Sequence, residues 1–195
     1  MTIQIRQRLI VAAPGTIAFW PSSRAAAQGK VEYKVLSTTK TSTMQKEMQE
    51  AAAAGYRFAD VMGGSTAIGG AEVVVIMTKQ TNPEAYDYRL LATNKTSTMQ
   101  KELQEAGDAG FAYKGQTAFK TGFGGKEVVC ILERAAKDAK ASRFEYRLLA
   151  TSKTSTMQKE LSEAGDQGFE FVGMTVAKTL MGGDEVVSIL RRKAQ

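Results

Sequence analysis

One segment of this chain occurs three times. The run KTSTMQKE begins at Lys40, at Lys95 and at Lys153, and 21 of 24 positions are identical between residues 88–111 and residues 146–169. A chain that repeats itself at this spacing builds one structural unit several times, and neighbouring units then bury each other's apolar surface. The sequence therefore predicts three tandem copies, which cover residues 31–80, 86–135 and 144–195.

Three stretches of each copy have the pattern of a β-strand. The opening stretch of the second copy, YDYRLLAT, alternates so that Tyr88, Leu90 and Ala92 share one face. After the helix, two aromatic residues two positions apart resume the chain, and a Gly-Gly pair predicts a hairpin turn. The closing stretches EVVVIM, EVVCIL and EVVSIL are mostly apolar after their first residue, which is typical of a central strand. The Gly-Gly pairs begin at Gly69, Gly124 and Gly182.

A short helix is predicted between the first two strands. Ser97 is followed three residues later by Gln100, the pattern of a capping box at a helix start. Met99, Leu103 and Ala106 then form one apolar stripe. A glycine at the end of each helix predicts the left-handed residue that closes it. In the other copies the capping serines are Ser42 and Ser155, and the stripes are Met44, Met48, Ala51 and Met157, Leu161, Ala164; the closing glycines are Gly55, Gly110 and Gly168.

The order of the strands follows from the rules for connections. A strand–helix–strand crossover leaves its two strands parallel, and the apolar third strand fits between them. We therefore predict an α+β fold of three tandem β-α-β-β repeats, each with sheet order 1-3-2 and its helix on one face. A unit of this size buries only about 60% of its unfolded surface, so we expect the three units to pack together with internal pseudo-symmetry.

The third copy resembles a small bacterial domain family of β-α-β-β units. Its run FEYRLLAT, its helix ending in GDQG, and the stretches GFEFVG and ILRRK are similar to units that read Tyr-Glu-Tyr-Lys-Val-Val, helix, Gly-Trp-Glu-Leu-Val and a final strand ending in Lys-Arg. Here Tyr56, Phe111 or Phe169 stands where tryptophan is usual. The resemblance implies the fold and a bacterial origin. It carries over no catalytic or binding residue, because the family has no assigned function.

The first 27 residues differ from the repeats. Arg6 and Arg8 precede an apolar run over residues 9–20, and the three alanines 25–27 are typical of a signal-peptide cleavage site. Pro14 interrupts the apolar run, so a disordered leader is the alternative interpretation. We expect export by the general route to a periplasmic or secreted location, with a cytoplasmic location as the alternative.

Composition excludes several classes of function. The net charge is +6, but the first 27 residues hold three of the 26 basic residues and no acid, and the remaining charges are interspersed. A nucleic-acid partner is therefore not predicted. The chain has no histidine, which removes Ser-His-Asp and Cys-His catalytic arrangements. No apolar run reaches eighteen residues, so we expect no integral membrane segment in the mature chain.

The start of each helix is the strongest candidate for a binding site. Unpaired amides, the positive end of the helix dipole, hydroxyl groups and a lysine are suited to phosphate or another anion. The alternative is an ordinary capped helix with a solvated lysine. The candidate anion-binding residues are Lys40, Ser42 and Thr43, Lys95, Ser97 and Thr98, and Lys153, Ser155 and Thr156.

The weaker candidates all have simpler explanations. Glu72, Glu127 and Glu185 follow the Gly-Gly turns and would hold calcium if they met, but a single glutamate at a strand start is usually solvated. Cys130 lies between apolar residues and is typical of a small buried hydrophobe, as are the methionines of the helix stripe. We predict no catalytic residue, no metal site and no cofactor.

The function predicted from these patterns is a non-catalytic, exported bacterial interaction or scaffold module. Its partner is unidentified, and the candidates are another envelope protein or a second copy of the chain. The first alternative is a small-molecule or anion binder that uses the helix starts. An enzyme is the second alternative, and the copy-specific residues Asp60, Lys114 and Val172 offer it no catalytic set.

Overall fold

The structure is a computed structural model, and it describes residues 30–66, 70–93, 95–120, 126–138, 143–178 and 184–194. The three copies belong to one compact unit, Val31–Gln195. The leader and the first glycine of each Gly-Gly pair lie outside the described residues, so the predictions of a signal peptide and of the turn geometry stay predictions.

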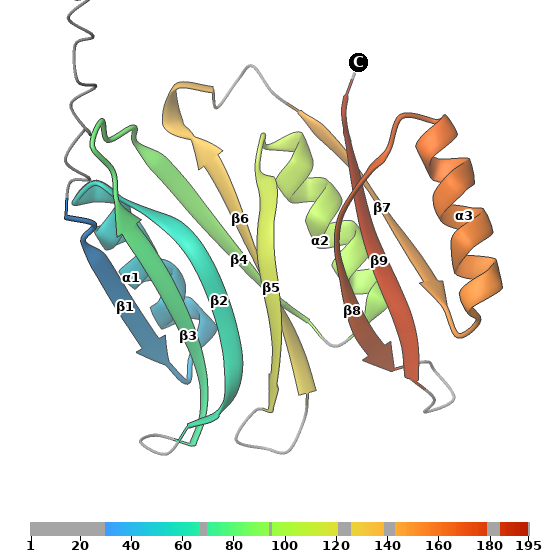
Figure 1. The fold of residues 1–195 in the computed structure, drawn as a ribbon, viewed down its shortest axis with the longest axis horizontal. Helices are drawn as coiled ribbons and strands as arrows, with labels where there is room; N and C mark the ends of the chain where they lie inside the picture. The colour runs from blue at the N-terminus through green and yellow to red at the C-terminus, as the bar shows by residue number, and fades with distance from the viewer. Residues whose placement is uncertain are drawn as a thin grey trace, which may run out of the picture. The chain divides into compact units, whose positions relative to one another are not determined.

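Each copy consists of a strand, a helix and a two-stranded hairpin, as predicted (Figure 1). The first copy comprises β1 (Tyr33–Thr38), α1 (Thr41–Ala53), β2 (Tyr56–Thr66) and β3 (Gly70–Lys79). The second comprises β4 (Tyr86–Thr93), α2 (Thr96–Asp108), β5 (Ala112–Lys120) and β6 (Lys126–Ala135), followed by a short 3-10 helix, η1 (Ala136–Asp138). The third comprises β7 (Phe144–Thr151), α3 (Thr154–Asp166), β8 (Glu170–Lys178) and β9 (Asp184–Lys193).

The predicted strand order is confirmed in all three sheets. The orders are β1-β3-β2, β4-β6-β5 and β7-β9-β8, and each outer strand is antiparallel to the central one. The second strand of each copy shifts register at the same place, between Phe58 and Asp60, Tyr113 and Gly115, and Phe171 and Gly173. The copies therefore share their irregularities as well as their regular elements.

The helix ends follow the predicted pattern only in part. The closing glycines Gly55, Gly110 and Gly168 have φ angles of 85°, 84° and 79°, so they are left-handed as expected. The predicted capping boxes are wrong: the residues before the helices are lysines, and no side chain caps the first turn. The serines lie inside the first turn instead, because a threonine at the end of the preceding strand holds the turn. In the second copy, Thr93 Oγ1 accepts a hydrogen bond of 3.3 Å from the Lys95 amide.

In the second and third copies, an arginine stacked on an aromatic ring contacts the C-terminal end of the helix. Arg134 lies 4.5 Å from the centre of the Phe111 ring, donates a 2.9 Å hydrogen bond to the Ala109 carbonyl and pairs with Asp87 at 2.7 Å. Arg192 repeats the stacking and both contacts in the third copy. A cation at a helix C-terminus interacts favourably with the dipole and with the ring face. This arrangement fixes the position of the helix over its own sheet.

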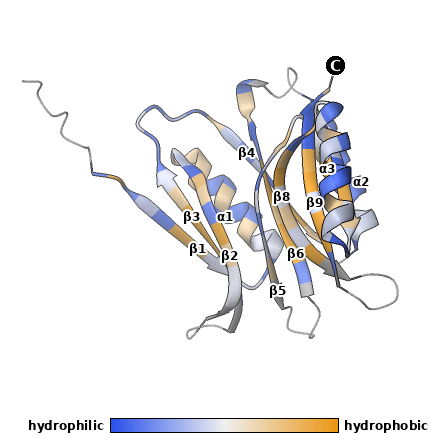
Figure 2. Ribbon diagram, turned by 45° about the vertical axis from the view of Figure 1, so that its right-hand side comes forward, coloured by the Kyte–Doolittle hydropathy of each residue, from blue (hydrophilic) through white to orange (hydrophobic). Residues whose placement is uncertain are grey.

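Each of the first two helices lies between two sheets. Met44 and Met48 of α1 are fully buried in one cluster that joins β3 of the first copy to Val129 and Ile131 of β6 in the second. α2 is buried in the same way between its own sheet and the third one, through Met99 and a cluster that includes Ile189. Figure 2 shows apolar colour on strands such as β9 and much hydrophilic colour on α3. The central strands of the second and third sheets, β6 and β9, are mostly apolar because each of these two sheets has a helix on both faces.

No helix within the described ranges is long and apolar enough to cross a membrane.

Candidate functional site

Two glutamines of α2 complete the edge of the next sheet. Gln100 Oε1 accepts a 2.8 Å hydrogen bond from the Leu148 amide, and its Nε2 donates 2.9 Å to the Tyr146 carbonyl. Gln104 accepts 3.0 Å from the Tyr146 amide and donates 3.2 Å to the Phe144 carbonyl. The two side chains thus satisfy backbone groups of β7 that a neighbouring strand would otherwise satisfy.

The same contact joins α1 to β4. Gln45 accepts a 2.9 Å hydrogen bond from the Leu90 amide. Gln49 accepts 3.1 Å from the Tyr88 amide and donates 3.1 Å to the Tyr86 carbonyl. The signal for this contact was present in the sequence as a pair of glutamines one helical turn apart, but sequence reasoning assigned the first glutamine of each pair to a capping box.

A buried tyrosine on the strand that the glutamines contact, β4 or β7, anchors each of these two contacts. Tyr88 and Tyr146 are each 4% exposed, and burial is the main cause that raises the pKa of both phenols. The Tyr88 hydroxyl accepts a 2.8 Å hydrogen bond from the Phe58 amide. The Tyr146 hydroxyl accepts 2.6 Å from the Tyr113 amide. Each phenol therefore bonds to the second strand of the preceding copy, at the start of its register shift.

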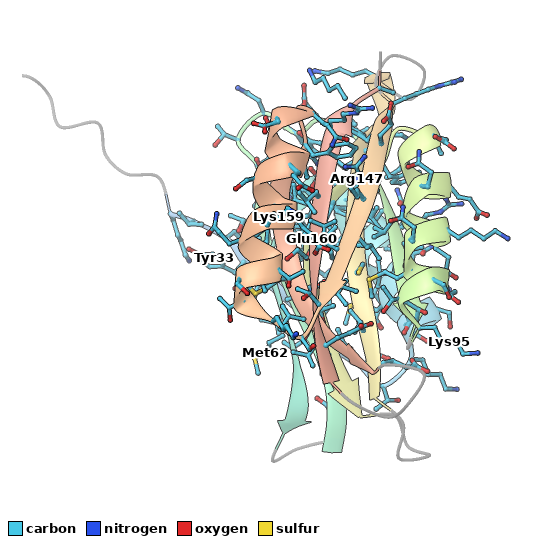
Figure 3. The ribbon with its side chains drawn as sticks, turned by 90° about the vertical axis from the view of Figure 1, so that its right-hand side faces the viewer. Tyr33, Met62, Lys95, Arg147, Lys159 and Glu160 are labelled. Carbon is cyan, nitrogen blue, oxygen red and sulfur yellow. The ribbon has the colours of Figure 1, made fainter. Side chains whose placement is uncertain are left out.

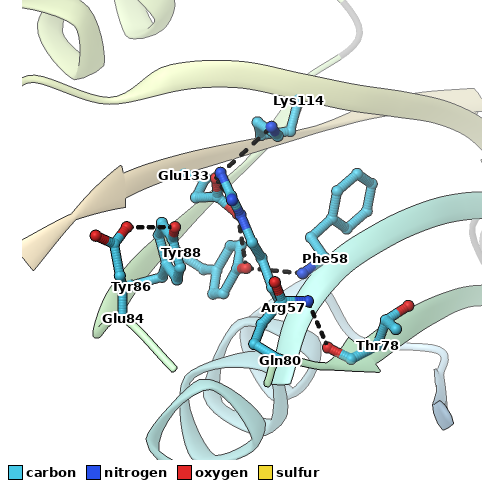
Figure 4. Close-up of polar contacts among 9 residues, drawn as sticks. All are labelled: Arg57, Phe58, Thr78, Gln80, Glu84, Tyr86, Tyr88, Lys114 and Glu133. Atoms are coloured by element: carbon cyan, nitrogen blue, oxygen red, sulfur yellow. Dashed lines mark hydrogen bonds and ion pairs between the residues drawn. The ribbon is translucent and has the colours of Figure 1, made fainter. Parts of the chain in front are cut away.

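A buried carboxylate strengthens the contact between the first two copies (Figure 4). Glu133 is 4% exposed and receives hydrogen bonds from Arg57 Nη2 at 2.7 Å and from the Tyr88 hydroxyl at 2.8 Å. Lys114 Nζ lies 3.6 Å from the same carboxylate. The hydrogen bond to Glu133 is the main cause that raises the pKa of Arg57.

This cluster was missed by sequence reasoning, which found no set of groups around Lys114. Tyr88, Lys114 and Glu133 lie on three different strands of the second copy, and the packing of the first copy against the second adds Arg57 to them. The Glu133 oxygens are occupied by the chain's own donors, so the cluster is suited to holding two copies together rather than to acting on a substrate.

The predicted anion-binding residues lie at the three helix starts. Lys40, Lys95 and Lys153 are the exposed residues before the helices. In α2 the Thr96 hydroxyl donates a 3.1 Å hydrogen bond to Glu185, so a carboxylate of the third copy already contacts this helix start. The anion site stays a prediction, and a calorimetric titration of phosphate into the protein and its Lys95→Ala variant tests it. The hydroxyl residues are exposed at Ser42, Ser97, Thr98, Ser155 and Thr156 and half-buried at Thr43.

The weaker candidates are explained by their surroundings. Glu72 accepts a 2.6 Å hydrogen bond from Ser37, whereas Glu185 bonds to the start of α2. The part of the chain that the structure describes contains no group of three His, Cys, Asp or Glu side chains that could hold a metal. Cys130 is fully buried, and burial raises its pKa to about 12, so the thiol is protonated near neutral pH.

The second and third sheets each have one face covered by the helix of the preceding copy, whereas no described helix covers the corresponding face of the first sheet. Alignment on the KTSTMQKE run makes Tyr33 the equivalent of Tyr88 and Tyr146, yet Tyr33 is 63% exposed. Val31 and Val35 are also exposed, although their equivalents in the second copy are buried. Met62 is also exposed. It lies on the same face as Tyr33 and Val35, because Val74 pairs with Met62 on one side and on the other with Ser37, the next residue of that face along β1. Figure 3 labels Tyr33 and Met62.

Within the described ranges, no further copy packs against the outer side of the third copy. Four residues of α1 and four of α2 are buried, but only Ala164 is buried in α3. Figure 3 looks from the side of the third copy, and α3 has no further strand in front of it. On β8, Phe171 is 53% exposed, whereas its equivalent Tyr113 is 7% exposed.

The two ends are therefore the candidate interaction surfaces. Among the described residues, the large hydrophobic side chains that are exposed all belong to the first and third copies. We call those of the first copy the head surface and those of the third copy, with α3, the tail surface. The head residues are Val31, Tyr33, Val35 and Met62, and the tail residues on β8 are Phe171, Met174 and Val176.

Comparison of the chain with protein-family models, with curated proteins and with solved structures finds no match.

Proposed function

We propose that this protein is a non-catalytic interaction module, exported by a bacterium, and that its head and tail surfaces are its binding surfaces. One observation carries the proposal: Tyr33 is 63% exposed at a position where the other two copies bury the same residue to 4%. Exposed apolar side chains that cluster on one face are typical of protein–protein contact sites. Export is supported by the leader pattern, and the bacterial origin by the resemblance of the repeats.

The arrangement of the repeats supports a scaffold role. The glutamine pairs, the buried tyrosines and the Glu133 cluster connect the copies through backbone and side-chain hydrogen bonds. A packed stack of this kind holds its two ends at a fixed separation, which suits a module that brings partners together.

Site-specific cross-linking tests the proposal. A photo-reactive phenylalanine is placed at Tyr33, at Met174 or, as the control, at the exposed Lys101 of α2, in cells that produce the protein. We expect discrete covalent adducts from positions 33 and 174 and none from position 101. Equal labelling at all three positions, or no adduct at either end, would contradict an interaction role.

The export part of the proposal has a separate test. The intact mass of the protein recovered from those cells should correspond to a chain that begins near Gln28. A mass for the full-length chain would contradict the assignment of residues 1–27 as a cleaved signal peptide.

A further inference from the structure

We infer that the partner of the head surface is the tail surface of a second copy of this chain, so that the protein assembles head to tail. The inference rests on the proposed function and names its partner. In this contact the free edge of β1 lies along α3 of the other molecule, and the outer face of the first sheet covers α3 and β8.

The chain itself shows how such surfaces fit. α1 covers β4 and α2 covers β7 through one contact, built from a glutamine on the helix, a tyrosine on the strand and an aromatic residue on the preceding second strand. The head surface supplies the strand half of this contact and the tail surface supplies the helix half. A second copy therefore continues an interface that occurs twice within each molecule.

The tail surface retains several parts of the helix half. Gln158 is exposed and is the equivalent of Gln45 and Gln100. Gly165 is also exposed, and a Cβ atom there would meet nothing within 4 Å. Its equivalent Gly107 lies so close to β7 that a Cβ atom would be 2.3 Å from the Phe144 carbonyl oxygen.

Two substitutions make the contact between molecules weaker than the contacts within them. Ser162 stands at the position of Gln49 and Gln104 in the other copies. Its side chain is too short to accept one hydrogen bond from the strand and donate another to it, as those glutamines do. Asp60 replaces the glycine found at Gly115 and Gly173, where the aromatic residue of the preceding copy packs closely. A Cβ atom at Gly115 would lie 3.1 Å from Phe58, so Asp60 requires Phe171 to shift. The assembly is therefore reversible and concentration-dependent.

The contact uses two different surfaces, so it does not close on itself in a dimer. Heterologous contacts of this kind produce rings or open filaments, in contrast to the paired contacts of a two-fold dimer. This polarity distinguishes the inference from any association through one surface alone.

Sedimentation velocity of the full chain, from low micromolar to near-millimolar concentration, measures the assembly. We expect species larger than a dimer to grow with concentration. Tyr33→Asp and Tyr33→Lys change the net charge in opposite directions, and both should weaken association about thirty-fold or more, as loss of a buried anchor does. Lys101→Gln, on the exposed side of α2, is the control and should leave it unchanged.

Mixing two blocked variants tests the polarity. Tyr33→Asp blocks the head and keeps the tail, whereas Gly165→Arg blocks the tail and keeps the head. Each variant alone should be monomeric, and an equimolar mixture should form a one-to-one dimer. Conversely, Ser162→Gln and Asp60→Gly restore the internal pattern, and each should tighten association about tenfold.

The inference is overturned if the wild-type chain stays monomeric over the whole range, or if Gly165→Arg still associates through Tyr33. Failure of this inference and failure of the proposed function would give different cross-linking results. Adducts at position 33 whose mass matches another protein would refute self-assembly and leave the interaction role intact, whereas no adduct at either end would refute the interaction role.

Discussion

The most informative single substitution replaces Gly107 by alanine, with Gly165→Ala as its matched control. The two helices differ at one position, since α2 reads TSTMQKELQEAGD and α3 reads TSTMQKELSEAGD. The local effect of an alanine on helix formation is therefore nearly the same at both sites. Only the surroundings differ, because Gly107 faces β7 and Gly165 faces solvent.

The expected effects have opposite signs. Alanine stabilises an exposed helix position by about 1 kcal/mol relative to glycine, so Gly165→Ala should raise the free energy of unfolding by up to that amount. At Gly107 the new Cβ atom would lie 2.3 Å from the Phe144 carbonyl oxygen and 2.9 Å from Tyr146 Cδ2. Relieving this overlap requires α2 to move away from β7, and such overpacking costs about 1–3 kcal/mol. The helix gain of about 1 kcal/mol is common to both variants, so Gly107→Ala should be less stable than Gly165→Ala by about 2 kcal/mol and less stable than the unsubstituted chain by about 1 kcal/mol.

Urea denaturation followed by circular dichroism, at a concentration where the chain is monomeric, measures both free energies of unfolding. The first copy shows that the fold accepts a methyl group here, because Ala52 occupies the equivalent position beneath β4. The contact between α2 and β7 is closer and lacks that space. If Gly107→Ala were as stable as Gly165→Ala, the close packing of α2 on β7 would be refuted.

Two further predictions concern the contacts between copies, and a third concerns the buried thiol of the second copy. Gln100→Ala should lower the free energy of unfolding by about 2 kcal/mol, because it leaves two backbone groups of β7 unpaired. The control, Gln158→Ala on α3, should change the free energy of unfolding by less than about 0.5 kcal/mol, and equal effects would contradict the glutamine contact. Glu133→Gln should lower it by about 1–3 kcal/mol, and Glu105→Gln, in an exposed pair, should have an effect below about 1 kcal/mol. Burial raises the pKa of Cys130 from 9.0 to about 12, so the unfolded chain loses this proton first. The stability that the buried thiol contributes is therefore complete below pH 9 and falls by about 1.4 kcal/mol per pH unit towards pH 12. Urea denaturation across this range should show a shallower decline for Cys130→Val, and parallel curves would contradict the burial of the thiol.

The architecture of one copy could be predicted because its signals are local. The alternation around Tyr88, the helix stripe at Met99 and Leu103, and the glycine at Gly110 each lie within one short stretch of chain. The apolar closing strand and the crossover rule then placed the third strand in the middle of the sheet, and the structure confirms that order.

The packing between copies was beyond sequence reasoning because it depends on residues far apart in the chain. Gln100 has the spacing of a capping residue, and only the position of β7 reveals that it bonds to the next copy. Glu133 and Arg57 are likewise brought together from different copies. The end surfaces could not be recognised before the covered face was known, since the residues around Tyr33 have the same pattern as those around Tyr146.

Amide hydrogen exchange at single-residue resolution tests the central claim. According to this claim, the head surface of the first copy and the tail surface of the third copy are the two unpaired halves of the contact that joins neighbouring copies. At low concentration, the amides of Leu90 and Leu148 should be protected by their glutamine partners, whereas that of Val35 should exchange freely. Val35 should become protected as the concentration rises, and the Gly165→Arg variant should abolish that protection. A Val35 amide that exchanges equally fast at every concentration would contradict the account.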